Sequence, residues 1–87
     1  MAFNIVKGIY RHTKSQNLYE VIGTARSVDD PHKTVVVYKQ LYPSIIKNTD
    51  IILPLGSLWF RDYDEFTGPM DDSNPSIKRF VKIDPKL

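Results

Sequence analysis

The sequence contains no cysteine, few glycines and no long apolar run. The absence of cysteine excludes disulfide bonds, thiolate metal sites and a cysteine nucleophile. The longest apolar run, residues 51–55, is far shorter than the roughly 20 residues that cross a membrane. The four glycines, at positions 8, 23, 56 and 68, are isolated, so no glycine-rich phosphate loop is present. With a start that lacks a basic leader and apolar stretch, this composition leads us to expect a cytoplasmic protein with no membrane association.

A chain of 87 residues is long enough for one domain and one core, so we expect a single domain over residues 1–87. A domain of this size has little core, and a partner chain would add to its stability. The net charge is only +2, and the basic residues are dispersed along the sequence. A dedicated nucleic-acid binder usually gathers them in a stripe or cluster, so the charge pattern argues against that class.

Alternation of apolar and polar residues predicts five strands, over residues 7–13, 18–26, 33–42, 57–61 and 77–83. Gly23 inside the second strand predicts a bulge or a sharp bend. The third strand is apolar on both faces, which predicts an interior position in the sheet. Asp62 and the acidic residues after it predict one helical turn over residues 62–66. Residues 43–56, with two prolines, are predicted to be a long loop.

Five short strands joined by turns predict a mainly β fold, either a small barrel or a strongly curled antiparallel sheet. No window keeps an apolar stripe at helical spacing for three turns, which excludes a helical bundle.

Motifs in four parts of the chain resemble a known family. They are Gly8-x-Tyr10-Arg11-His12-x-Lys14, Tyr19-x-Val21-x-Gly23-x-Ala25-Arg26-Ser27, Val36-Val37-Tyr38-x-x-Leu41-Tyr42 and Leu58-Trp59-x-Arg61, with Phe66 after them. The combination, over residues 8–42 and 57–83, resembles the bacterial family catalogued as domain of unknown function 1653. The resemblance implies an SH3-like small β-barrel of unassigned activity, so it implies no catalytic residues.

The sequence departs from the pattern of that family in three places. Arg26 stands where the family often has histidine, and Asp62 stands where it usually has proline. Residues 43–56 form a longer stretch than the corresponding loop of the family. The resemblance therefore supports no role for a histidine at position 26.

Aromatic and basic residues on the predicted strands suggest a ligand-binding face. Arginine offers a rigid fork of donors, histidine exchanges a proton near neutral pH, and exposed aromatic rings stack on flat ligands. The competing interpretation is structural, with Arg11 paired to Glu20 across a hairpin and with Tyr19, Phe60 and Phe80 in the core. The candidate site residues are Tyr10, Arg11, His12, Tyr38, Trp59 and Arg61.

No catalytic constellation is recognisable. His12 and His32 are too few for a zinc site, and the acidic residues lack the spacing of a calcium loop, so we expect no metal and no cofactor. Whether the chain is an enzyme stays open, with the balance against it. The favoured hypothesis is a non-enzymatic binding or interaction module for an unidentified peptide, small molecule or nucleic acid.

Two alternatives belong to other classes. The first is a structural homodimer that pairs through Val35, Val37 and residues 51–55. The second is a weak binder of RNA or single-stranded DNA, whose affinity would fall steeply with salt.

Overall fold

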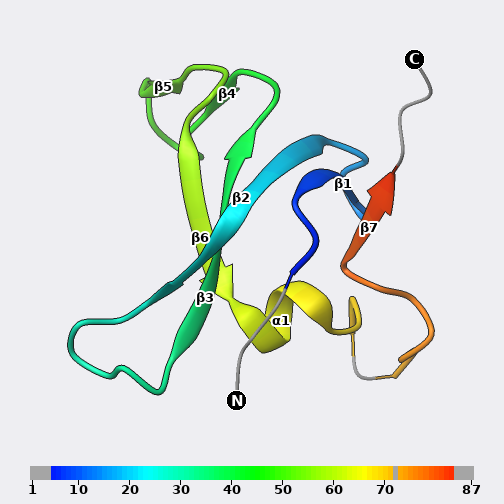
Figure 1. Cartoon of the computed structure of the whole chain (residues 1–87). Helices are drawn as coiled ribbons and strands as arrows, with labels where there is room; N and C mark the ends of the chain where they lie inside the picture. The colour runs from blue at the N-terminus through cyan, green and yellow to red at the C-terminus, as the bar shows by residue number, and fades with distance from the viewer. Residues whose placement is uncertain (1–4, 72, 84–87) are drawn as a thin grey trace.

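A five-stranded antiparallel sheet and one short helix make up most of the computed structural model, which describes residues 5–71 and 73–83. The strand order is β6-β3-β2-β1-β7, and a separate two-stranded ribbon joins β4 to β5 (Figure 1). The elements are β1 (Gly8–His12), β2 (Leu18–Arg26), β3 (Thr34–Gln40), β4 (Ser44–Ile45), β5 (Ile52–Leu53), β6 (Leu58–Asp62), α1 (Tyr63–Thr67) and β7 (Phe80–Ile83).

The sheet curls because β2 is interrupted by a bulge. Val21 pairs with Tyr38 of β3, and Gly23 pairs with the adjacent residue of β3, Val37. Ile22 therefore has no partner on β3. An extra residue bends its strand and increases the local twist. The predicted irregularity at Gly23 is therefore confirmed. Figure 1 shows the result: β2, β3 and β6 form one arm, β1 and β7 form the other, and α1 lies between them at the base.

Aromatic rings fill the space between the two arms. Phe66 of α1 is fully buried and stacks on Phe80 of β7, with 4.1 Å between ring centroids and 12° between ring planes. Tyr10 of β1 and Tyr38 of β3 contact the same Phe66 ring at 5.5 and 5.2 Å. Such contacts add to the large apolar area that each ring removes from water. The short helix therefore supplies the ring that joins the two arms.

The curled antiparallel sheet and its interior strand β3 are confirmed, but the sheet is not closed into a barrel. In the described part of the chain no ladder of hydrogen bonds joins β6 to β7. The gap is instead spanned by side chains: the guanidinium carbon of Arg61 lies 5.8 Å from the centroid of the Phe80 ring. Among the described residues, the outer edges of β6 and β7 therefore have no strand partner.

The predicted elements are close to the observed ones, with two main differences. The predicted loop over residues 43–56 contains the β4–β5 ribbon, which is two residues long on each side. The last strand begins at Phe80, later than predicted. The helical turn is confirmed, and the Asp62 carboxylate caps it by accepting a hydrogen bond from the Asp64 amide at 3.2 Å.

Two side-chain expectations were wrong. Phe60, expected in the core, is 72% exposed because it lies opposite Val37 on the outer face of the sheet. Glu20, expected to pair with Arg11, instead pairs with Lys39 of β3 at 3.3 Å. No helix among the described residues is long and apolar enough to span a membrane.

Candidate functional site

Strand alternation divides the candidate site residues between the core, the inner face of the sheet and its outer face. Tyr10 and Tyr38 are buried in the core. Arg11 follows Tyr10 on β1, so its side chain points to the opposite face, where it is exposed. His12, Trp59 and Arg61 remain at the rim of the space between the arms. We call this group, together with Arg79 described below, the rim cluster.

A buried amide fixes the position of Trp59. The Gln40 side chain is fully buried at the end of β3, and its Oε1 accepts a 2.8 Å hydrogen bond from the Trp59 indole nitrogen. The Gln40 Nε2 donates to the backbone carbonyls of Tyr42 at 2.8 Å and Leu53 at 3.1 Å. The Gln40 side chain thus links β6 to the segments that precede and include the β4–β5 ribbon. Trp59 remains 42% exposed, with its polar edge satisfied and the rest of its indole ring available to a ligand.

Two tyrosines beside Gln40 share a hydrogen bond. The hydroxyl oxygens of Tyr19 and Tyr42 lie 2.6 Å apart. Burial raises the pKa of Tyr19, and the hydrogen bond to Tyr42 raises it further. The Tyr19 ring also contacts Tyr38 at 5.3 Å and Phe80 at 5.8 Å, so this hydroxyl pair is continuous with the aromatic core.

Arg61, Phe80 and His12 form a connected group across the two arms. Arg61 of β6 lies over the Phe80 ring, and the His12 ring meets Phe80 edge-on with 4.9 Å between centroids. His12 and Phe80 are direct partners in the β1–β7 pairing. The β1–β7 pairing therefore brings residues 12 and 80 together, and the curling of the sheet brings residue 61 to them.

The electrostatics of the rim cluster are positive. Burial lowers the pKa of His12, and the charges of Arg61, Arg79 and Lys14 lower it further, in that order. The Nδ1 of His12 accepts a 3.3 Å hydrogen bond from the Ser15 amide, which requires that nitrogen to be unprotonated. A neutral ring of this tautomer carries its hydrogen on Nε2 and can donate it to a ligand.

The two arginines of the rim cluster are incompletely satisfied. The Nε atoms of Arg61 and Arg79 are buried and have no hydrogen-bond partner among the described residues. Arg61 contacts Glu65 at 3.6 Å, whereas Arg79 makes no ion pair with any described residue. Two guanidinium groups beside a neutral histidine favour the approach of an anion, which would accept hydrogen bonds from their Nη groups and offset their repulsion.

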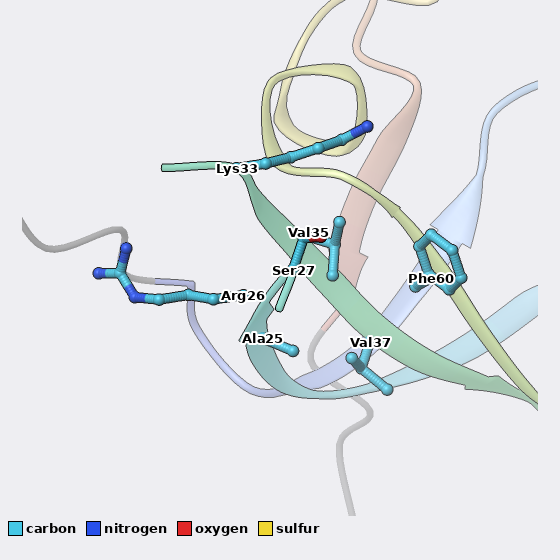
Figure 2. A pocket seen from close by; sticks show the side chains of 7 residues that line it. All are labelled: Ala25, Arg26, Ser27, Lys33, Val35, Val37 and Phe60. Atoms are coloured by element: carbon cyan, nitrogen blue, oxygen red, sulfur yellow. The ribbon is translucent and has the colours of Figure 1, made fainter. Parts of the chain in front are cut away.

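A separate hollow of about 410 Å³ lies on the outer face of the sheet (Figure 2). Its floor is apolar, with Val35 and Val37 of β3 beside the exposed Phe60 ring of β6, and Arg26 and Lys33 stand at its edge. None of the described residues that line it is an aspartate, glutamate, histidine or tyrosine. Its apolar floor is suited to contact with another apolar surface rather than to chemistry.

Comparison with protein families matches residues 8–82 to the family described as "Protein of unknown function (DUF1653)". The chain belongs to this family. No curated protein and no solved structure matches the chain. DUF1653 membership covers β1 to β7 up to Lys82, so every residue of the rim cluster lies within the matched region.

Two residues of this DUF1653 site were not predicted as site residues. Gln40 continues the inward alternation of Thr34, Val36 and Tyr38, and that alternation alone would have predicted a buried amide in need of partners. Arg79 lies 67 residues from His12 in the sequence, and only the β1–β7 pairing brings them together. Among the described residues, no group of histidine, aspartate or glutamate has the arrangement of a metal site.

Proposed function

We propose that the chain is a non-enzymatic binding module that receives an anionic group at the rim cluster. One observation carries the proposal: Arg61 of β6 and Arg79, the residue before β7, both lower the pKa of His12 by their charge, and Arg79 forms no ion pair with any described residue. A carboxylate or phosphate accepts bonds from arginine in a fixed fork geometry. Exposed Trp59 beside Arg61 offers an apolar surface to the rest of the ligand.

Inorganic phosphate, titrated at constant ionic strength, is the simplest probe of this site. We expect it to shift the NMR signals of His12, Arg61 and Arg79, and we expect R61Q and R79Q together to reduce its affinity by at least about tenfold, since each charge-assisted bond contributes about 1.5–3 kcal/mol. Arg26→Gln, on the outer face, is the matched control and should bind as the wild type does. Equal affinity of the double variant and the control would contradict the proposal.

Glu65 provides a second test in the opposite direction. Its carboxylate lies 3.6 Å from Arg61 and competes with a bound anion for the same guanidinium. Glu65→Gln should therefore raise the affinity for phosphate a few-fold, because exposed ion pairs contribute up to about 1 kcal/mol. A lower affinity would show that Glu65 positions Arg61 for binding rather than competing for it.

The exposed Trp59 also favours a second candidate, binding of RNA or single-stranded DNA by base stacking. An oligonucleotide that contacts Arg61 and Arg79 should lose affinity steeply as salt rises, and Trp59→Ala should remove about 1–3 kcal/mol of binding. Titration with poly-uridine at two salt concentrations distinguishes this ligand from a small anion. Binding of phosphate with no binding of the oligonucleotide would exclude it.

Three finer properties complete the proposal. The five strands curled around one aromatic core support an open relative of the SH3-like barrel. The resemblance described above supports a bacterial source, and the absence of cysteine supports the reducing cytoplasm as its location.

A further inference from the structure

The outer edge of β6 has no strand partner among the described residues. Edge strands are usually guarded by lysine, proline, a bulge or a covering segment. β6 instead presents Leu58, Trp59 and Phe60 in succession, and it pairs only with β3 in the described part of the chain. Leu58 is 64% exposed and Phe60 is 72% exposed. A row of free backbone groups flanked by exposed apolar side chains is a template for another strand.

The direction of the backbone groups on β6 follows from its pairing with β3. The Gln40 amide donates to the Ser57 carbonyl at 3.0 Å, and the Gln40 carbonyl accepts from the Gly56 amide at 2.8 Å, so the backbone of Gln40 faces β6. Because this direction alternates along an antiparallel pair, Trp59 and Arg61 direct their backbone groups toward β3. Phe60 therefore directs its amide and carbonyl toward the free edge.

We infer that a second copy of the chain occupies this edge, with the two β6 strands antiparallel around a two-fold axis at Phe60. Phe60 then lies opposite Phe60 of the second copy and exchanges both backbone hydrogen bonds with it. On the inner face Trp59 lies beside Arg61 of the second copy, a favourable cation and ring pair. Leu58 lies opposite Asp62. All five residues of the strand are paired, and no like charges face each other.

Neighbouring registers of the same pairing are poorer. A shift toward Arg61 places two Arg61 side chains opposite each other, which is unfavourable for like charges. A shift toward Trp59 shortens the paired segment. The side chains of β6 are thus complementary to those of a second β6 strand when the two-fold axis passes through Phe60. This complementarity favours a second copy of the chain over an unrelated strand. Pairing also makes the two outer hollows into one apolar surface, since Val37 lies next to Phe60 in each copy.

The experiment uses charge reversal at the two-fold axis. Sedimentation velocity of the wild type from about 10 µM to about 1 mM should show a monomer–dimer equilibrium, because an interface this small gives an affinity in the micromolar range. Phe60→Lys alone and Phe60→Glu alone should each be monomeric, because like charges would face each other across the axis. An equimolar mixture of the two variants should regain the dimer.

The control is Val28→Lys, a change at an even more exposed apolar residue in the turn before β3, which should dimerise as the wild type does. Circular dichroism checks that the variants fold, and phosphate binding should persist in the Phe60 variants because the rim cluster lies on the other face. A monomeric wild type at about 1 mM would overturn the inference and leave the edge to a strand of another protein. Dimers of both single variants, or no dimer in their mixture, would also overturn it.

Discussion

The Trp59 indole donates a 2.8 Å hydrogen bond to the side chain of Gln40, which is itself fully buried. This bond connects the interior strand β3 to the edge strand β6 through side chains as well as through the backbone ladder. It also explains how an exposed ring on an edge strand is held in one orientation beside the rim cluster. The stability of the fold and the geometry of the candidate site therefore depend on the same amide.

Replacing Gln40 by methionine should reduce the free energy of unfolding by about 2–4 kcal/mol. Methionine keeps the volume but leaves the Trp59 indole and the carbonyls of Tyr42 and Leu53 without their partner. Urea denaturation measures the loss, and the fluorescence of Trp59 should shift in the folded variant. Gln16→Met, at an exposed turn where the side chain donates one hydrogen bond to the Thr13 carbonyl, is the control and should cost less than about 1 kcal/mol. Equal effects at the two positions would contradict the role assigned to Gln40.

Gly68, directly after α1, should not tolerate a side chain. A Cβ atom at this position would lie 2.6 Å from the Asp64 carbonyl oxygen, so the end of the helix must move. Gly68→Ala should lower the free energy of unfolding by about 1–3 kcal/mol, as overpacking generally does. Gly23→Ala is the control, because its Cβ would meet only the Lys7 side chain at 3.9 Å. Thermal denaturation compares the two, and a more stable Gly68→Ala variant would contradict the packing described for α1.

The free energy of unfolding should decrease as the pH falls below about 6.5, the ordinary pKa of histidine. Burial and three nearby positive charges lower the pKa of His12 in the folded state, so the unfolded chain takes up a proton first. The stability that the neutral His12 side chain contributes is fully present above pH 6.5, and it is lost as the pH falls through the lowered pKa. Urea denaturation at pH 7.5 and pH 5.5 should show a smaller difference for His12→Gln than for the wild type. An equal difference in the wild type and in His12→Gln would show that protonation of His12 does not destabilise the folded state.

The Tyr19–Tyr42 pair should govern stability at high pH. The pKa of Tyr19 is raised, first by burial and then by its bond to Tyr42. Its contribution to stability is therefore present below about pH 10 and is lost as the pH rises above that value. Tyr42→Phe should lower the pKa of Tyr19 only in part, because burial remains. Alkaline ultraviolet titration of the variant measures this, and a full return to the ordinary tyrosine value would assign the shift to the hydrogen bond instead.

The sequence predicted the strands well because alternation and turn residues are local signals. It predicted the curl of the sheet from five short strands joined by turns, and it predicted the bulge in the second strand from Gly23. It failed at Phe60, because a five-residue strand with Trp59, Phe60 and Arg61 has bulky side chains on both faces and no local signal says which face is inside. Only the pairing of Phe60 with Val37 decides this.

The candidate site was less predictable than the strands. The sequence indicated His12, Trp59 and Arg61 by their residue types. Their positions at the rim of the space between the two arms depend on the curling of the sheet, which the sequence does not specify in detail. Arg79 could not be predicted as a site residue, because it lies near His12 only through the pairing of β1 with β7, at the two ends of the chain. Long-range pairing of this kind leaves no periodic trace in a single sequence.

The pKa of His12, measured by NMR in the wild type and in Arg61→Gln, tests the account most directly. If the curled sheet brings the charge of Arg61 to His12, the wild-type pKa lies below about 6.5 and the variant titrates at a higher pH. Saturation of the wild type with phosphate should raise the pKa as well, since a bound anion offsets the same charges. A wild-type pKa at or above the ordinary value, unmoved by both the substitution and phosphate, would contradict the account.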